Sequence, residues 1–273
     1  MTAVPTGAED WPAIHRRLAA EYEPLRGELT GRVRRAMHDA GLGGQGAADA
    51  WFDNWIVKAA DELRYLGLGE QARLRSVEVH GLDGLAEPGR GPTVLAGTHL
   101  DAHTLGLVHL DTLGVPSTIV VHEKMLPIVA NYGMRHAEFV AGGAQLSAAV
   151  RRVRTEGGVL AAYADVDGTG APVRVHGGRI AGESPITRLI DVVRGSVVRW
   201  RLRPNGDAEA RRWSLELTPS SRDGLRSEVE RDLTSAPERW MLWRQVPVAG
   251  LGLRQLGWHG SSRDREKGSH GTS

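Results

Sequence analysis

Residues 93–104 read TVLAGTHLDAHT and decide the fold, because a short apolar run gives way within a few residues to polar side chains and then to a helical pattern. In an open α/β sheet the chain turns from the carboxyl end of a strand into a helix, and functional side chains gather at that turn. His99 stands there, where an imidazole can act as a general base on a hydroxyl or an amine. A buried structural histidine is the alternative interpretation.

Apolar runs of strand length alternate with helical patterns from about residue 73 onward. The predicted strands are Ser76–Val79, Thr93–Ala96, Ser117–Val121, Glu138–Val140, Val159–Tyr163, Val173–Val175, Ser196–Leu202 and Arg212–Leu217. The predicted helices are His103–Leu113, Leu126–His136, Ala144–Thr155, Pro185–Arg194, Gly224–Thr234 and Pro237–Trp243. This alternation predicts an α/β fold with a mostly parallel central sheet flanked by helices.

The first 70 residues show the different pattern of amphipathic helices. Apolar residues recur every three to four positions over 11–40, and Pro24 should kink or split this helix near its middle. A glycine-rich break at 41–46 separates it from a second helix over 47–65. We therefore predict an N-terminal helical segment (1–70), an α/β domain (71–259) and a polar, disordered tail (260–273).

The composition excludes several classes of protein. With 41% hydrophobic and 25% charged residues, the 273-residue chain resembles a soluble globular protein, and no apolar run approaches the roughly 18 residues of a membrane span. Without cysteine it has neither disulfides nor thiolate ligands, and its net charge of +1 creates no overall field that favours nucleic acid. We predict a cytoplasmic protein without a cofactor, at most docked at a membrane surface. Its eight tryptophans against two phenylalanines are unusual, but such residues at helical spacing usually line a core.

Four segments resemble, in the same order along the chain, the lysophospholipid acyltransferase superfamily, and most closely its bacterial lipid A (lauroyl/myristoyl) acyltransferase branch. They are 77–99 (VEVHGLDGLAEPGRGPTVLAGTH), 157–165 (GGVLAAYAD), 172–179 (PVRVHGGR) and 237–243 (PERWMLW). The resemblance extends over about residues 75–245. It implies an α/β acyltransferase fold and the transfer of an activated acyl group.

The signature of that family is a histidine followed five positions later by an acid. The carboxylate orients the imidazole, which deprotonates an acceptor that then attacks an acyl thioester. His99 matches the histidine, but Thr104 stands at the position of the acid. Three side chains are candidates to replace it: Asp101 if 99–102 are loop, Glu123 after the next predicted strand, or Thr104 itself as a neutral partner. If none of them does, the site binds a ligand without catalysis.

Four further residues are candidates for contact with a substrate. His103 lies one helical turn from His99, and Asp165 ends a predicted strand at the rim of the expected site. Arg135 and Arg179 are candidates to bind an anion, such as a carrier phosphopantetheine. The two histidines also have the spacing of a metal pair on a helix, but no third ligand is fixed by the sequence, and we predict no metal site.

The resemblance predicts an acyltransferase that moves an activated acyl group to a hydroxyl or an amine, with His99 as general base. The donor would be acyl carrier protein, a coenzyme A thioester or aminoacyl-tRNA, and the acceptor a lipid or a small molecule. The acid Glu123 and the missing apolar anchor favour a first alternative, a soluble aminoacyl-tRNA-dependent transferase of specialised metabolism that acts on an amine or hydroxylamine. A second alternative is a non-catalytic binding protein of the same fold.

Overall fold

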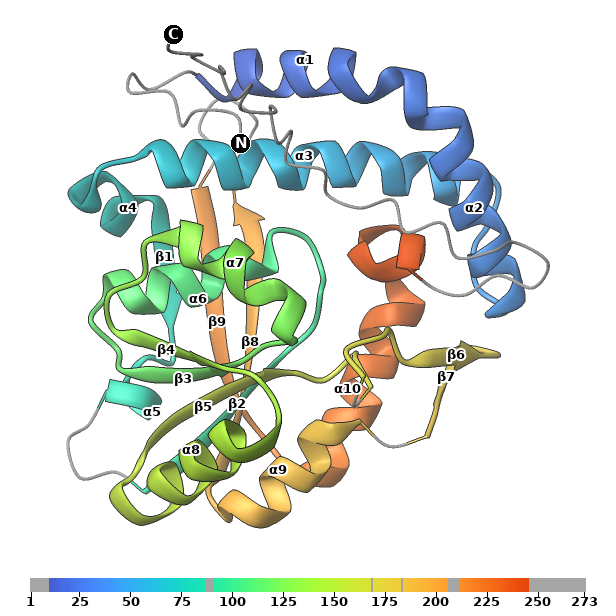
Figure 1. Ribbon diagram of the computed structural model, residues 1–273. Helices are drawn as coiled ribbons and strands as arrows, with labels where there is room; N and C mark the ends of the chain where they lie inside the picture. Colours follow the sequence, from blue (N-terminus) through green and yellow to red (C-terminus); the bar gives the residue numbers. More distant parts are fainter. Residues whose placement is uncertain (1–9, 87–90, 168, 183, 206–211, 246–273) are drawn as a thin grey trace, which may run out of the picture.

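The centre of the molecule is a sheet with helices on both faces (Figure 1). The computed structural model describes residues 10–86, 91–167, 169–182, 184–205 and 212–245, and in these ranges seven strands pair in the order β1-β9-β8-β2-β5-β3-β4. Their bounds are β1 (Val77–His80), β2 (Pro92–Gly97), β3 (Ser117–Val120), β4 (Ala137–Val140), β5 (Gly158–Tyr163), β8 (Ser196–Asn205) and β9 (Arg212–Ser220). A separate hairpin contains β6 (Arg174–His176) and β7 (Arg179–Ala181), of which β7 is not predicted by the sequence. The predicted tail lies outside the described residues.

Strand direction confirms the predicted, mostly parallel sheet. β8, β2, β5, β3 and β4 run parallel, whereas β9 is antiparallel to β8 and β1 is parallel to β9. The carboxyl ends of five strands therefore meet at one edge of the sheet, where β9 and β1 begin. Five of the six residues of β2 are buried, as is typical of a central parallel strand with helices on both faces.

Two clusters of buried side chains, one on each face of the sheet, hold the layers together. Val94 of β2 belongs to the cluster shared with α8 (Gly143–Glu156), α9 (Pro185–Val193) and α10 (Arg222–Ser235). Leu95, the next residue, belongs to the cluster on the other face, shared with α6 (His103–Thr112). Successive side chains of a strand point to opposite faces, so one strand anchors both layers.

The N-terminal helices pack into the same core as the sheet. The prolyl break separates α1 (Trp11–Tyr22) from α2 (Arg26–Asp39) through the 3-10 turn η1 (Glu23–Leu25), as predicted. After them, α3 (Ala47–Gly67) crosses the carboxyl edge of β8 (Figure 1). The buried Trp51 of α3 lies in one hydrophobic cluster with Val94 and its neighbours. The helical segment therefore closes the edge of the sheet at which functional residues are expected.

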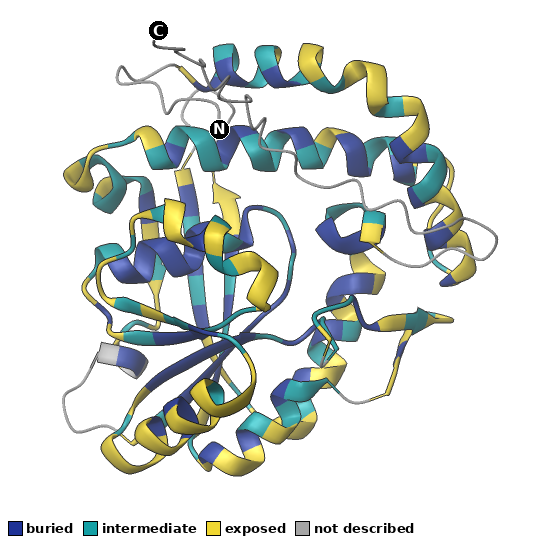
Figure 2. Cartoon of the chain, in the orientation of Figure 1, coloured by how far each residue is buried: buried dark blue, intermediate teal, exposed yellow. Residues whose placement is uncertain are grey.

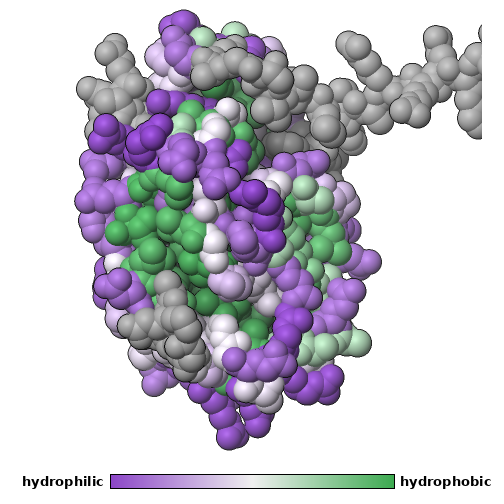
Figure 3. All heavy atoms as spheres, turned by 90° about the vertical axis from the view of Figure 1, so that its left-hand side faces the viewer, coloured by the Kyte–Doolittle hydropathy of each residue, from purple (hydrophilic) through white to green (hydrophobic). Residues whose placement is uncertain are grey.

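Burial follows these layers. Figure 2 shows β2 and β5 buried along most of their length, whereas the flanking helices are exposed on their outer faces. The side that carries α4 (Glu70–Ser76) and α5 (Asp83–Ala86) shows an apolar area surrounded by hydrophilic residues (Figure 3). Leu66, Leu82 and Leu113 are among the partly buried side chains that pack on the adjacent core cluster.

Two predicted helices are wrong in part. The helix predicted over Leu126–His136 ends early, because α7 (Leu126–Val129) passes into the 3-10 turn η3 (Ala130–Tyr132). Gly133 follows with a φ of 65°, and a glycine in this left-handed conformation is a common helix terminator.

The helix predicted over Pro237–Trp243 consists of two 3-10 turns, η4 (Pro237–Arg239) and η5 (Met241–Gln245). Between them Trp240 is extended, with φ −79° and ψ 113°. Its backbone forms an isolated antiparallel bridge with Leu100. This pairing with the loop after β2 requires an extended residue, so a continuous helix cannot form.

Replacement of Gly97 by alanine should destabilise the protein. A Cβ at this position would lie 2.2 Å from Cζ2 of Trp200, whose side chain is only 1% exposed and cannot move aside. We expect the free energy of unfolding to fall by about 1–3 kcal/mol, as measured by urea unfolding. Gly31→Ala in α2 is the matched control, because an added Cβ meets no atom within 4 Å and alanine favours a helix. Equal stability of the two variants would contradict the prediction.

Candidate active site

His99 and Asp165 come together at the carboxyl edge of the sheet. They follow the neighbouring strands β2 and β5, in which Gly97 is paired with Tyr163, so each stands two residues beyond that pair. Nδ1 of His99 lies 2.8 Å from Oδ1 of Asp165, and the backbone N–H of His99 donates to Oδ2 at 2.6 Å. The register of the two strands therefore positions this histidine–carboxylate pair.

The carboxylate of Asp165 is fully buried, and its hydrogen bonds satisfy it. Besides the two donors of His99, the indole N–H of Trp240 donates to Oδ2 at 2.7 Å. A buried carboxylate needs such donors, and its ionised form only accepts hydrogen bonds. Nδ1 of His99 accordingly carries the proton, which leaves Nε2 free to accept one. The His99 side chain is 17% exposed, so solvent and small molecules can reach it.

The partner of His99 is not one of the three side chains that we predicted. Asp101 instead forms a two-pronged ion pair with Arg239, in which Nε donates to Oδ1 at 2.7 Å and Nη2 donates to Oδ2. Glu123 is exposed at the start of the 3-10 turn η2 (Glu123–Met125) and makes no hydrogen bond to His99 in the described part of the chain. The carboxylate that contacts His99 is that of Asp165, which we expected to contact substrate at the rim.

Thr104 and His103 belong to a second hydrogen-bonded group beside the ring of His99. The hydroxyl of Tyr163 lies 2.9 Å from Nδ1 of His103, and the hydroxyl of Thr104 lies 3.3 Å from the same atom. The ring of His99 stacks on Tyr163 with centroids 3.9 Å apart and meets His103 edge-on. Burial, with the charges of His99 and Lys58, lowers the pKa of His103 well below its usual value, and burial raises the pKa of Tyr163. Both groups are therefore neutral around pH 7 and flank His99 without competing for its proton.

The structure does not bring the two candidate arginines to His99. Arg135 precedes β4 and thus lies at the amino edge of the sheet, where it forms an ion pair with Glu70 at 2.6 Å. Arg179 is exposed in β7, beside a hairpin turn whose backbone donates to the carbonyl of Ala40. Neither position supports the predicted contact with a substrate at His99.

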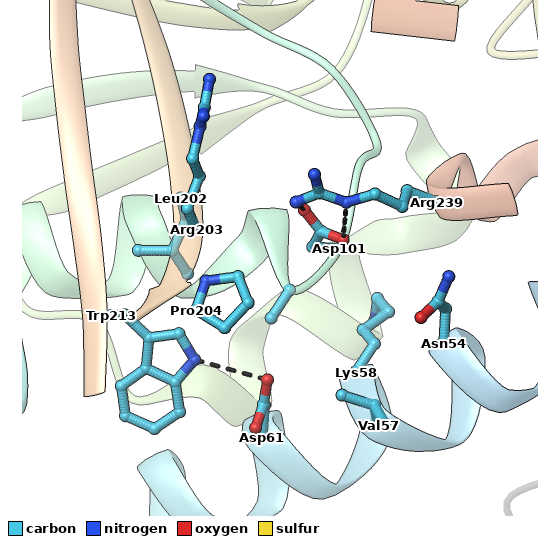
Figure 4. A pocket seen from close by; sticks show the side chains of 11 residues that line it. Asn54, Val57, Lys58, Asp61, Asp101, Leu202, Arg203, Pro204, Trp213 and Arg239 are labelled. Carbon is cyan, nitrogen blue, oxygen red and sulfur yellow. Dashed lines mark hydrogen bonds and ion pairs between the residues drawn. The ribbon is translucent and has the colours of Figure 1, made fainter. Parts of the chain in front are cut away.

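A cavity of about 360 Å³ opens beside Asp101, between α3 and the end of the β8–β9 pair (Figure 4). Five of its lining side chains are charged, namely Lys58, Asp61, Asp101, Arg203 and Arg239. The carboxylate of Asp61 is 3% exposed and accepts indole N–H groups from two tryptophans. The charged lining suits a small polar molecule. Asp101 and Ala102 connect the cavity to the loop that carries His99, whose own side chain does not line it.

The histidines and acids of residues 99–111 do not assemble into a metal site. In the described ranges, no group of three or more such side chains is arranged to hold an ion. His109 instead lies 2.8 Å from the hydroxyl of Tyr65, and Asp111 accepts the backbone N–H groups of Arg135 and His136. These two residues serve the packing of α6 and the start of β4.

Sequence analysis missed three residues of this site: Tyr163, Arg239 and Trp240. Tyr163 ends a predicted strand two residues before Asp165, and Arg239 and Trp240 lie in the segment 237–243 that resembles the family. Arg239 and Trp240 lie more than 70 residues from Asp165 along the chain. No local pattern connects them to β5, so only the folded structure reveals the contact.

No family model matches the chain, and no curated protein matches it. The crystal structure of the 1-acyl-sn-glycerophosphate (LPA) acyltransferase PlsC from Thermotoga maritima is similar over 78% of this chain and 95% of that chain, with 14% identity and a TM-score of 0.37. Similarity of this size assigns neither a family nor an activity, and the lipid A branch stays a prediction. No helix among the described residues is both long and apolar enough to cross a bilayer.

The stability of the protein should depend on pH through His109. Burial lowers the pKa of this histidine to about 4, from 6.5. Between these values the unfolded chain binds the proton more readily, so the free energy of unfolding should fall as the pH decreases from 6.5 to 4, by up to about 3 kcal/mol. Urea unfolding across this range measures the slope. His109→Gln should reduce this slope and leave the part that comes from His103, whereas His38→Gln at an exposed position should leave it unchanged. Equal slopes in the wild type and His109→Gln would contradict this assignment.

Proposed function

We propose that the protein is an acyltransferase in which His99 is the general base and Asp165 orients it. The observation that carries the proposal is the 2.8 Å contact between Nδ1 of His99 and the fully buried carboxylate of Asp165. A carboxylate on one ring nitrogen prepares the other nitrogen to accept a proton. The resemblance of four chain segments to lysophospholipid acyltransferases supports acyl transfer as the reaction that uses this base.

The transfer follows from the arrangement of the pair. Nε2 of His99 takes the proton of an acceptor hydroxyl or amine while the acceptor oxygen or nitrogen attacks the acyl carbonyl carbon. The tetrahedral intermediate then expels the thiolate or alkoxide of the donor, which receives the proton from Nε2. The new ester or amide bond replaces the donor bond, and no further reactant is consumed. The charge of Asp165 stabilises the imidazolium that exists between the two proton transfers.

The charged cavity beside Asp101 supports a small polar acceptor. A long alkyl chain placed there would remove water from charged side chains without replacing its hydrogen bonds, which is costly. An amine or hydroxyl compound with polar groups avoids this cost. The donor remains one of the three classes expected from the sequence: acyl carrier protein, coenzyme A thioester or aminoacyl-tRNA. The aminoacyl-tRNA-dependent alternative uses the same base and differs in the donor consumed.

Replacement of either member of the pair should abolish most of the transfer. Purified protein is incubated with acyl thioesters of several chain lengths, charged tRNA and a panel of amines and alcohols, and the products are identified by mass. His99→Ala should lower the rate by about 10²–10⁴-fold, which is the usual contribution of a positioned base. Asp165→Asn should cause a large loss as well, because the amide cannot replace both acceptor oxygens.

Glu123→Gln distinguishes Asp165 from one of the three candidates that the sequence offers, and this variant should retain its activity. Transfer that persists in His99→Ala would exclude the proposed base. No transfer from any donor, with acceptor binding intact, would identify the non-catalytic binding protein instead.

Narrowing the cavity should weaken acceptor binding selectively. Val57 lines the cavity from α3, and Val57→Phe should raise KM for the acceptor by about tenfold, equivalent to about 1.4 kcal/mol. The KM for the donor should not change. Val192→Phe on α9, where the side chain is 49% exposed, is the matched control and should change neither constant. An unchanged acceptor KM in Val57→Phe, at unchanged thermal stability, would place the acceptor elsewhere.

A further inference from the structure

We propose that Trp240 is a positioning residue for His99, because its indole N–H holds the Asp165 carboxylate in the orientation that accepts the Nδ1 proton. Nε1 of Trp240 donates to Oδ2 of Asp165 at 2.7 Å, and both side chains are 0% exposed. The functional part of this inference rests on the proposed role of His99. The positioning itself can be measured without a substrate.

The two oxygens of Asp165 have different partners. Oδ1 faces the imidazole of His99, whereas Oδ2 accepts two N–H groups, one from the backbone of His99 and one from Trp240. Both donors of His99 belong to one residue and move with it. The indole comes from a distant part of the chain and gives the carboxylate a second, independent anchor. Loss of that donor would leave a buried lone pair unsatisfied and favour rotation of the carboxylate away from the ring.

Trp240 is itself fixed in place. The indole N–H of Trp51, on α3, donates to the carbonyl of Trp240 at 3.0 Å. The ring of Trp240 meets that of Trp243 edge-on, with centroids 4.7 Å apart. Trp240 is thus held both at its backbone carbonyl and at its ring. Its indole has little freedom to move and can keep the Asp165 carboxylate in a fixed orientation.

The backbone around Trp240 also clamps the loop that carries His99. The N–H of Met241 donates to the carbonyl of His99, and the N–H of Asp101 donates to the carbonyl of Arg239. Asp101 has a φ of 48°, a conformation that residues with a side chain seldom adopt, and its carboxylate is held by the ion pair with Arg239. The 3-10 segment 237–245 therefore positions both members of the pair, His99 by its backbone and Asp165 by its indole.

The test compares Trp240→Phe with Trp243→Phe. Both variants remove one buried indole N–H from the same aromatic pair, but that of Trp243 donates to the carbonyl of Pro237 and not to Asp165. Nitrogen-15 NMR of the histidine rings reports the tautomer of His99 and the exchange rate of its Nδ1 proton, with His99→Gln to assign the signals. The wild type and Trp243→Phe should show a single tautomer with a protected Nδ1 proton. Trp240→Phe should show mixed tautomers and fast exchange.

We expect Trp240→Phe to lower kcat and to leave KM unchanged. In Trp240→Phe, kcat should fall by about ten- to a hundredfold, the range set by one hydrogen bond to a charged group, with KM unchanged. If Trp240→Phe fails to fold, 3-benzothienylalanine introduced at position 240 keeps the shape of the indole and replaces only the N–H by sulfur. The same His99 signals in this variant as in the wild type would overturn the positioning role. A failure of the proposed function is visible separately, as acyl transfer retained by His99→Ala.

Discussion

The fold of this protein depends on the burial of one carboxylate, that of Asp165. Burial of an ionised group is costly unless hydrogen bonds replace those of water, and here three N–H groups from two distant parts of the chain replace them. These bonds match the register of β2 against β5, and they hold the segment 237–245 against the loop after β2. The same contacts leave Nε2 of His99 as the nitrogen available for chemistry. The hydrogen bonds that stabilise the buried carboxylate are therefore the same ones that orient His99 as a base.

The helical N-terminal segment completes this arrangement. α3 crosses the carboxyl edge, where Trp51 donates to the carbonyl of Trp240 and Asn54 donates to that of Glu238. The same helix contributes Lys58 and Asp61 to the cavity. One hydrophobic cluster joins these helices to the sheet, so the site combines residues from both parts of the chain. The sequence pattern changes near residue 70, but residues on both sides of this point pack in one hydrophobic cluster.

Much of the fold could be predicted from the sequence, because apolar periodicity is a local property. The central strands, most flanking helices and the place of His99 at the end of β2 follow from it. The partner of His99 does not, because strand order is not a local property. One of the three candidates, Glu123, follows the next strand along the chain, but β5 lies between β2 and β3 in the sheet. The adjacent carboxyl end is therefore that of β5, and the acid that reaches the histidine is Asp165.

The contact of Trp240 with Asp165 could not be predicted for a different reason. The residue type and spacing of Trp240 are those of a core residue, and it is indeed buried. What distinguishes it is the hydrogen bond that a buried indole N–H requires and a phenyl ring does not. Such bonds recur across this molecule, from Trp11 and Trp213 to Asp61, from Trp51 to the carbonyl of Trp240, and from Trp240 to Asp165. Each joins residues at least 50 positions apart, and three of the four end on the buried carboxylates of Asp61 and Asp165. The excess of tryptophan over phenylalanine in this chain is consistent with a core that must donate hydrogen bonds as well as exclude water.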